Sequence, residues 1–228
     1  MVLHPNELAK IQFFYGIKNN DNLGFEYFIF CTFAKYKLSI MNEKIIIFSA
    51  PSGSGKTTIL KALIQSDLHL AFSISATSRQ QRKNESDGKD YYFFTPEQFK
   101  KELIQGSFIE WQEVYENQFY GTLKTEIDRL FALKKNVVFD VDVLGGLSLK
   151  RIFGDKAFAI FIMPPSLETL ENRLLKRGTE TEESLRKRLQ KADYELSFAH
   201  NFDYILVNDN LEESIETAHR IILEFLEN

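Results

Sequence analysis

The sequence predicts an α/β fold in which helices cover both faces of a mostly parallel sheet. Short apolar runs, rich in β-branched and aromatic residues, alternate along most of the chain with amphipathic segments. Such runs are typical of strands that are buried on both faces. A glycine-rich turn also directly follows the first run. Alternation of strands and helices in this manner indicates parallel βα units.

The first expected strand is Lys44–Ser49, and the helix Thr57–Ile64 follows it to complete one βα unit. Four later runs are expected to be further strands: Phe72–Ser75, Val137–Asp140, Phe158–Ile162 and Tyr204–Val207. Helix starts are marked by side chains that accept hydrogen bonds from the N–H groups of the first turn. These capping signals are Thr95 with Gln98, Ser166 after Pro165, and Asn210 before Glu212 and Glu213.

Two stretches interrupt this alternation. Within residues 90–121, short strands are expected around one helix, which predicts an inserted, β-rich lobe; the expected strands are Tyr91–Phe94, Ile109–Tyr115 and Phe119–Tyr120. Residues 177–188 are dense in both signs of charge and poor in apolar residues. We expect this second stretch to project into solvent as a mobile segment.

Length and composition favour one compact domain that works in the cytoplasm. The chain has 228 residues, and a net charge of −4 argues against broad nucleic-acid binding. Its single cysteine, Cys31, cannot form an intrachain disulfide, which indicates a reducing compartment. The early apolar stretch Tyr27–Ala34 is too short to cross a membrane, and no export signal is recognisable.

The composition changes near Met41, where an aromatic-rich leader without sustained periodicity gives way to the first apolar run. We expect residues 1–40 to be a poorly ordered N-terminal extension, with a partner-binding arm as the alternative. Met41 is also a plausible alternative translation start. The folded domain is therefore expected over residues 41–228.

The turn between the first strand and helix fits the P-loop pattern, with alanine in place of its first glycine. Its glycines let backbone N–H groups point at phosphate oxygens, and the helix N-terminus favours negative charge. The lysine suits the β- and γ-phosphates of a nucleoside triphosphate, and the hydroxyl of the threonine can ligate magnesium. A glycine-rich turn with an exposed lysine is the alternative. The turn comprises Ala50, Pro51, Ser52, Gly53, Ser54, Gly55, Lys56 and Thr57.

A second basic segment follows, in which Arg79 and Arg82 are three residues apart. Two planar guanidinium groups at this spacing can converge on one phosphate, and nearby tyrosines can add hydroxyl donors. Taken alone, the segment could equally be a polar loop with solvated arginines.

The whole segment resembles the signature of the guanylate kinase family, with every fixed position met by Thr77, Ser78, Arg79, Arg82, Glu85, Gly88, Tyr91 and Phe93. The resemblance extends over about residues 43–226, through Phe108-Ile109-Glu110-Trp111, Tyr120-Gly121-Thr122, Asp140-Val141-Asp142, Pro164-Pro165-Ser166, Arg177-Gly178-Thr179-Glu180 and Val207-Asn208-Asp209. Two departures are that Leu144 stands where many members have glutamine, and that the loop before Tyr120 is one residue longer than in some members.

The resemblance implies a P-loop kinase core over residues 41–75, 123–176 and 197–228, a GMP-binding lobe over 76–122 and a helical lid over 177–196. It implies that ATP is bound by the P-loop residues and Asn208. It also implies that GMP is bound by Ser75, Arg79, Arg82, Tyr91, Glu110, Tyr120, Thr122, Asp140 and Asp142.

In this reading Glu110 and Thr122 recognise guanine, because a carboxylate can accept hydrogen bonds from the adjacent N1–H and N2–H₂ donors of that base. For Glu110 alone, an exposed strand carboxylate is the alternative. Asp140 and Asp142 end an expected strand, and either could instead cap the turn that follows. In the family they face the nucleotide and its magnesium, with Thr57 as the direct ligand and Asp140 acting through water.

The catalytic residues implied by the resemblance are Lys56, Arg79 and the lid arginines Arg173, Arg177 and Arg188. The alternative for the lid arginines is a solvated, charged helix. The expected reaction is transfer of the terminal phosphoryl group of ATP to GMP with Mg²⁺, and no general base is needed because a phosphate monoester is already anionic at neutral pH. No role is expected for the four histidines.

The expected partners are ATP, GMP and dGMP, with no nucleic acid or membrane, in a monomer or weak homo-oligomer. Two other functions remain open. One is a non-catalytic guanylate-kinase-like binding module, against which Lys56 argues. The other is a P-loop kinase that acts on a phosphorylated sugar, against which Glu110 with Thr122 argues.

Overall fold

The computed structural model describes residues 43–176 and 182–228. The expectations for residues 1–40 and for Arg177 lie outside the described residues. Within the described part, the chain divides into two units. The core unit comprises Glu43–Phe72 and Leu130–Asn228, and the lobe unit comprises Ser73–Arg129, which includes the lobe expected at 76–122. No helix among the described residues is long and apolar enough to span a bilayer.

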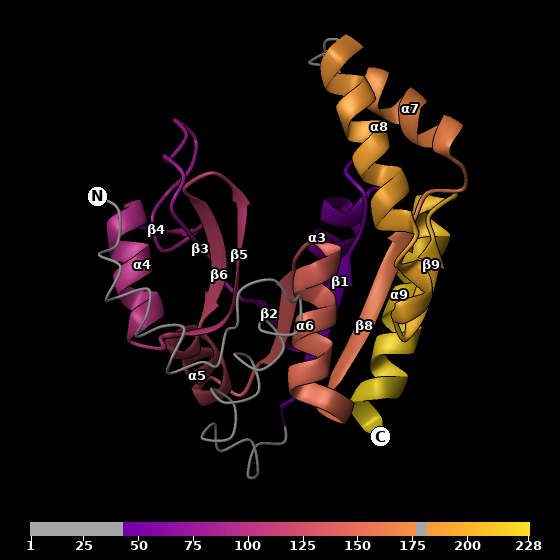
Figure 1. Ribbon diagram of the computed structural model, residues 1–228. Helices are drawn as coiled ribbons and strands as arrows, with labels where there is room; N and C mark the ends of the chain where they lie inside the picture. The colour runs from indigo at the N-terminus through magenta and orange to yellow at the C-terminus, as the bar shows by residue number, and fades with distance from the viewer. Residues whose placement is uncertain (1–42, 177–181) are drawn as a thin grey trace. The chain divides into compact units, whose positions relative to one another are not determined.

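The core unit contains a five-stranded sheet in which all neighbouring strands are parallel. The strand order is β2-β7-β1-β8-β9, so that the first strand lies at the centre of the sheet (Figure 1). The strands are β1 Ile45–Ser49, β2 Leu70–Phe72, β7 Asn136–Asp140, β8 Ala157–Met163 and β9 Tyr204–Val207. The predicted parallel α/β sheet is thus confirmed.

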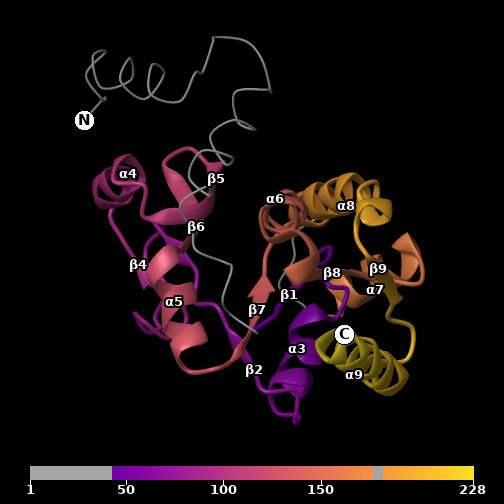
Figure 2. The same ribbon diagram turned by 90° about the horizontal axis from the view of Figure 1, so that it is seen from below.

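Helices cover both faces of this sheet, as expected. Helices α3 (Lys56–Ile64) and α9 (Leu211–Glu227) contact each other on one face, and α6 (Val143–Phe153) packs on β1 and β8 on the other (Figure 2). Short 3₁₀ turns, Gly154–Lys156 and Ala199–Asn201, precede β8 and β9. The sheet is therefore buried on both sides, which explains why its strands are almost entirely apolar.

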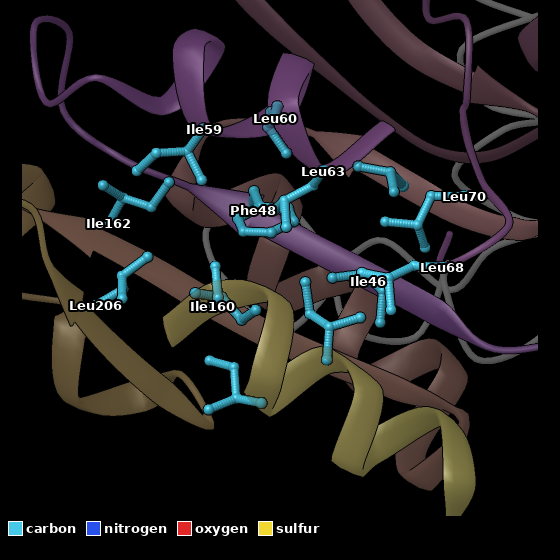
Figure 3. Packing of buried hydrophobic residues seen from close by; sticks show 14 of the residues in the cluster. Ile46, Phe48, Ile59, Leu60, Leu63, Leu68, Leu70, Ile160, Ile162 and Leu206 are labelled. Carbon is cyan, nitrogen blue, oxygen red and sulfur yellow. The ribbon is translucent and has the colours of Figure 1, made fainter. Parts of the chain in front are cut away.

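Strand β1 shows how the two faces are filled. Ile46 and Phe48 pack into the cluster beneath α3, together with Leu60 and Leu63 (Figure 3). Successive side chains of a strand point to opposite faces. Ile47 accordingly lies on the face covered by α6, where a Cβ placed on Gly146 would come 3.4 Å from it. This packing fixes the end of β1, and with it the turn that enters α3.

The lobe unit has its own four-stranded sheet, in the order β4-β3-β6-β5. Helix α4 packs against it through Phe99, which is fully buried and stacks on Phe108 and Phe119. Helix α5 follows β6 and runs across the boundary between the units at Arg129. The elements are β3 Ala76–Thr77, β4 Tyr92–Phe93, α4 Pro96–Ile104, β5 Phe108–Tyr115, β6 Gln118–Leu123 and α5 Lys124–Ala132.

The three capping signals are confirmed. Thr95 and Gln98 form a reciprocal capping box at the start of α4. Ser166 accepts a hydrogen bond from Thr169 at the start of α7 (Leu167–Leu175), and Asn210 accepts from Glu212 and Glu213 at the start of α9. Each cap satisfies N–H groups that have no partner within their own helix.

The strand expected at Phe72–Ser75 was placed wrongly. Strand β2 ends at Phe72, because beyond this residue the backbone bonds to groups of the lobe instead of the core sheet. The N–H of Ile74 donates to Glu126, and the carbonyl of Ser75 accepts from Tyr92. The short strand β3, which was not expected, begins directly afterwards at Ala76.

Part of the charged stretch 177–188 forms regular structure. Helix α8 spans Glu182–Leu196, and its residues Leu185 and Ala192 are buried against Leu170 and Leu174 of α7. The expected solvated segment is therefore, from residue 182 onward, a helix with a narrow apolar face. Residues 177–181 lie outside the described residues.

Candidate active site

Glycine is required at two positions of the turn between β1 and α3. Gly53 and Gly55 have φ angles of 98° and 91°, in the region that favours glycine. A Cβ on Gly55 would also lie 2.3 Å from Nδ2 of Asn208, and one on Gly53 would lie 3.0 Å from Leu170. Gly55 provides no side-chain cap for α3, so the N–H groups of its first turn can receive an anion.

Lys56, the first residue of α3, points toward the carboxyl end of β7. Its ammonium group forms an ion pair with Asp140 and donates a 3.2 Å hydrogen bond to the carbonyl of Val141. Asp140 ends β7, the strand beside β1. The parallel register therefore brings the predicted lysine and the predicted metal-binding carboxylate together at one edge of the sheet.

A cavity of about 390 Å³ opens over this turn, entirely within the core unit. Its size is within the range of ligand pockets, roughly 300–1,000 Å³. Arg188 of α8 reaches the turn and donates a 2.9 Å hydrogen bond to the hydroxyl of Ser52. The cavity is lined by Ala50, Pro51, Ser52, Gly53, Gly55, Lys56, Thr57, Thr58, Asp140, Val141, Asp142, Arg188, Lys191 and Glu195.

Four residues of this cavity were missed in the sequence, and two of them, Lys191 and Glu195, are charged; the other two are Thr58 and Val141. Lys191 follows Arg188 by three residues and Glu195 follows Lys191 by four, so they lie on the same face of α8 as Arg188. The ammonium nitrogen of Lys191 is 3.7 Å from Oε1 of Glu195. Burial raises the pKa of Glu195 above its usual value, and Asp142 adds to the rise, while Lys191 opposes it. Helical spacing from Arg188 was the one signal that could have identified them.

Asn208, directly after β9, links the phosphate turn to α7. Its Nδ2 donates a 2.7 Å hydrogen bond to the carbonyl of Ser54, and its own carbonyl accepts a 3.0 Å bond from Arg173. Within the described residues, three buried polar atoms of this group have no hydrogen-bond partner: the Ser54 hydroxyl, Asn208 Oδ1 and Arg173 Nη1. Arg173 thus lies beside the phosphate turn, where its side chain donates to the backbone carbonyl of Asn208.

Asp142 performs the capping role that was the alternative reading. Its side chain accepts a 2.8 Å hydrogen bond from Gly145 and forms the N-cap of α6. Its carbonyl also accepts a bond from the Ser49 hydroxyl at the end of β1. Asp142 therefore fixes the start of α6 while lining the cavity. Leu144, in the next turn, is 39% exposed.

In the lobe unit, the Arg79 guanidinium is held from several sides. It forms paired hydrogen bonds of 2.7 and 2.6 Å to the carboxylate of Glu85, and it lies 4.9 Å from the centre of the Tyr91 ring. The hydrogen bonds from Arg79 and from the backbone of Arg82 lower the pKa of Glu85 to about 2. Tyr120 packs edge-on against Tyr91. Arg79, Tyr91 and Tyr120 therefore form one cluster in the lobe unit.

Glu110 and Thr122 are paired across β5 and β6. The Thr122 hydroxyl donates a 2.7 Å hydrogen bond to Oε1 of Glu110, and both residues are buried. Burial of a carboxylate is costly unless polar groups bind it, so an exposed strand residue is no longer a tenable interpretation of Glu110. Glu110 is therefore a buried acceptor on the sheet that also carries Tyr120.

The other predicted residues of the lobe are less closely connected. Ser75 lies between β2 and β3, and its carbonyl accepts from Tyr92. The Arg82 side chain is exposed, although its backbone N–H donates to Glu85. Asp140 and Asp142 belong to the core unit.

The loop after the central strand of a parallel sheet, with a lysine inside the cavity above it, defines a P-loop nucleotide-binding protein. The family model for guanylate kinase matches residues 42–225. A guanylate kinase of Bacteroides fragilis is 50% identical over 183 residues, which are 80% of this chain and 90% of that protein. A guanylate kinase of Porphyromonas gingivalis is 48% identical over 80% of this chain and 98% of its own length.

A solved structure supports the same assignment. The crystal structure of guanylate kinase from Anaplasma phagocytophilum superposes with a TM-score of 0.63 at 28% identity, covering 82% of this chain and 87% of that one. The chain belongs to the guanylate kinase family.

Proposed function

We propose that this protein transfers the γ-phosphoryl group of ATP to GMP, giving ADP and GDP. The buried pair of Glu110 and Thr122 is the observation that carries this choice of acceptor. A carboxylate can accept hydrogen bonds from both N1–H and N2–H₂ of guanine, whereas adenine offers no such pair of donors. A buried polar site that is left unpaired by the wrong base can discriminate by roughly 10⁴–10⁵.

The core unit supplies the binding site for the triphosphate of ATP. Backbone N–H groups of residues 52–57 surround the phosphates, and Lys56 exchanges its contact with Asp140 for the β- and γ-phosphate oxygens. Arg188 and Lys191 add positive charge from α8, beside the same cavity. The orphaned polar atoms of Ser54, Asn208 and Arg173 also suit a polar ligand at this place.

The lobe unit supplies the binding site for GMP. Arg79 is preoriented by Glu85. Arg82, Tyr91, Tyr120 and Ser75 complete the set that binds GMP, with the arginines and tyrosines on its phosphate. Preorientation matters because less conformational entropy is lost when the anion binds.

Magnesium is the metal that this donor set fits. The exposed hydroxyl of Thr57 and the carboxylate of Asp140 line the same cavity, and Mg²⁺ commonly uses few protein oxygens while it keeps several waters. Thr57 would bind the metal directly and Asp140 through water. When bound, the metal supplies charge that offsets the negative phosphates.

The chemistry needs shielding of charge more than a base. The second pKa of a phosphate monoester is near ~6, so the attacking oxygen of GMP is already an anion at neutral pH. The obstacle is repulsion between two anions, which Lys56 and the lid arginines Arg173, Arg177 and Arg188 reduce. One well-placed arginine can be worth ~10³–10⁵ in rate.

Further features of the proposal concern the setting of the enzyme. The acceptors include dGMP, because Glu110 and Thr122 are proposed to contact the base and not the sugar. The protein works on free nucleotides in the cytoplasm as a monomer or weak homo-oligomer. Its net charge of −4 supports free nucleotides rather than nucleic acids as ligands, since proteins that bind nucleic acids usually carry a basic excess.

An ADP-release assay with GMP, dGMP, AMP and sugar phosphates tests the proposal. We expect turnover with GMP and dGMP alone, and Lys56→Met should lower kcat by about 10²–10³. Lys61→Met is the matched control, because Lys61 is exposed on the same helix. Preference for AMP or a sugar phosphate would contradict the proposal, and so would full activity of Lys56→Met.

A further inference from the structure

A buried carboxylate outside the predicted site ties together separate segments of the lobe. The side chain of Glu126, in the first turn of α5, is 0% exposed. Its Oε1 accepts hydrogen bonds from the backbone N–H of Ile74 at 3.0 Å and from Arg129 at 2.9 Å. Its Oε2 accepts from the Tyr92 hydroxyl and from Nε of Arg129, both at 2.9 Å. Four donors therefore converge on one carboxylate.

The electrostatics show that these donors bind the charged form. Burial favours the neutral acid, but the hydrogen bonds from Arg129, Ile74 and Tyr92 outweigh it and lower the pKa of Glu126. Burial and the hydrogen bond to Glu126 also raise the pKa of Tyr92. Glu126 is therefore ionised at neutral pH, and hydrogen bonds to an ionised acceptor are among the stronger ones. Arg129 is 46% exposed, so the buried contacts to Ile74 and Tyr92 matter more.

The residues that Glu126 contacts are neighbours of the GMP site. Ile74 precedes Ser75, and Tyr92 follows Tyr91, whose ring lies under Arg79. Tyr92 also donates a 2.9 Å backbone hydrogen bond to the carbonyl of Ser75. Glu126 thus binds Ile74, which precedes Ser75, and Tyr92, which follows Tyr91. Both Ser75 and Tyr91 are proposed to bind GMP.

We propose that Glu126 is a positioning residue for GMP: its carboxylate fixes the segments 74–75 and 91–92 on α5, so that Ser75 and Tyr91 are preorganised to bind the nucleotide. This inference rests on the proposed function. Ile74 and Arg129 also lie next to the two places where the chain passes between the units, at 72/73 and 129/130. Glu126 accepts hydrogen bonds from both residues and so links these two crossings within the lobe unit.

Steady-state kinetics of three variants test the inference. Glu126→Ala is expected to raise the KM for GMP about tenfold, with the KM for ATP within about twofold of wild type. Glu126→Gln keeps one acceptor for Ile74 and should have an intermediate effect. Tyr92→Phe removes one hydroxyl and should raise the KM for GMP about threefold, which keeps the test decisive even where Glu126→Ala does not fold.

Asp203→Asn provides the matched control, because Asp203 likewise accepts from a backbone N–H, that of Ala159, and pairs with Lys150 at 2.8 Å in the core unit. It should lower thermal stability and leave the KM for GMP unchanged. A wild-type enzyme that fails to phosphorylate GMP would overturn the proposed function itself. If the wild type is active, unchanged KM values for GMP in Glu126→Gln and Tyr92→Phe overturn the inference alone, as do equal increases for both substrates.

Discussion

Lys56, the first residue of α3 in the phosphate loop, forms an ion pair with Asp140 at the end of β7. The lysine side chain is 18% exposed and the aspartate side chain 39% exposed, so the pair lies at the wall of the cavity rather than deep in the core. The proposed function requires ATP to draw the ammonium group away from this carboxylate, where bound magnesium would supply the positive charge beside Asp140. We therefore expect ATP and magnesium to depend on each other for binding.

The substitution Asp140→Asn separates the effect of this carboxylate on ATP binding from its effect on activity with magnesium. The substitution removes a negative charge that opposes a polyphosphate, so ATP should bind severalfold more tightly when EDTA is present. Activity with magnesium should fall by about 10²-fold, because the metal loses a partner. Isothermal titration and ADP release measure the two quantities, with Asp155→Asn in the exposed turn before β8 as control. Weaker binding of ATP in EDTA would contradict the exchange.

Asn208→Ala should weaken the phosphate loop specifically. The variant loses the 2.7 Å bond to the Ser54 carbonyl, which leaves that acceptor buried and costs about 1–3 kcal/mol. The KM for ATP should rise about tenfold with an unchanged KM for GMP. Asn210→Ala is the control: it removes the N-cap of α9 and about 1 kcal/mol of stability, but touches no residue of the loop. Equal KM values for ATP in both variants would argue against a role of Asn208.

The pair of Arg79 and Glu85 gives a stability that depends on pH. Because the pKa of Glu85 is lowered from 4.5 to about 2, folding favours its charged form. The stabilisation is present above pH 4.5 and is lost as the pH falls toward 2. In urea unfolding, wild type should therefore have a higher free energy of unfolding than Glu85→Gln at pH 6. This difference in free energy should shrink below pH 4.5. Glu116→Gln, in the exposed hairpin turn, serves as control. A difference that stays constant down to pH 3 would be the contrary result.

Glu195 should behave in the opposite way. Burial raises its pKa, so folding favours the protonated acid and the charged form lowers stability at neutral pH. Glu195→Gln should therefore increase the free energy of unfolding at pH 7, and the gain should vanish as the pH falls below 4.5, the usual value for this carboxyl. Glu183→Gln on the exposed face of α8 should show no such trend. Destabilisation by Glu195→Gln at pH 7 would contradict this account.

Much of the core fold could be predicted because its strands are buried on both faces. The runs around Ile46, Val138 and Ile160 are almost wholly apolar, and such runs have few alternatives in a folded chain. The strand near Phe72 was misplaced because Ile74 looks equally strand-like, yet its N–H is taken by Glu126, more than fifty residues along the chain. Periodicity within one segment carries no information about so distant a partner.

The candidate site was predictable where a local motif specifies the geometry. The phosphate loop depends on backbone angles of Gly53 and Gly55, which residue type reveals directly. Lys191 and Glu195 share a helical face with Arg188, but only the packing of α8 on α7 shows that this face meets the cavity. Glu126 was missed for the same reason, since its donors come from three different segments.

The most direct test of the account is the ratio of kcat/KM for GMP to that for IMP, which lacks the N2 amino group. Wild type should prefer GMP by about 10²-fold or more, because Glu110 loses one donor with IMP. Glu110→Gln should lower kcat/KM for GMP by about 10²-fold and bring the ratio close to one, with the KM for ATP unchanged. A ratio that Glu110→Gln leaves at its wild-type value would show that this carboxylate does not recognise guanine, and would contradict the proposed binding of GMP.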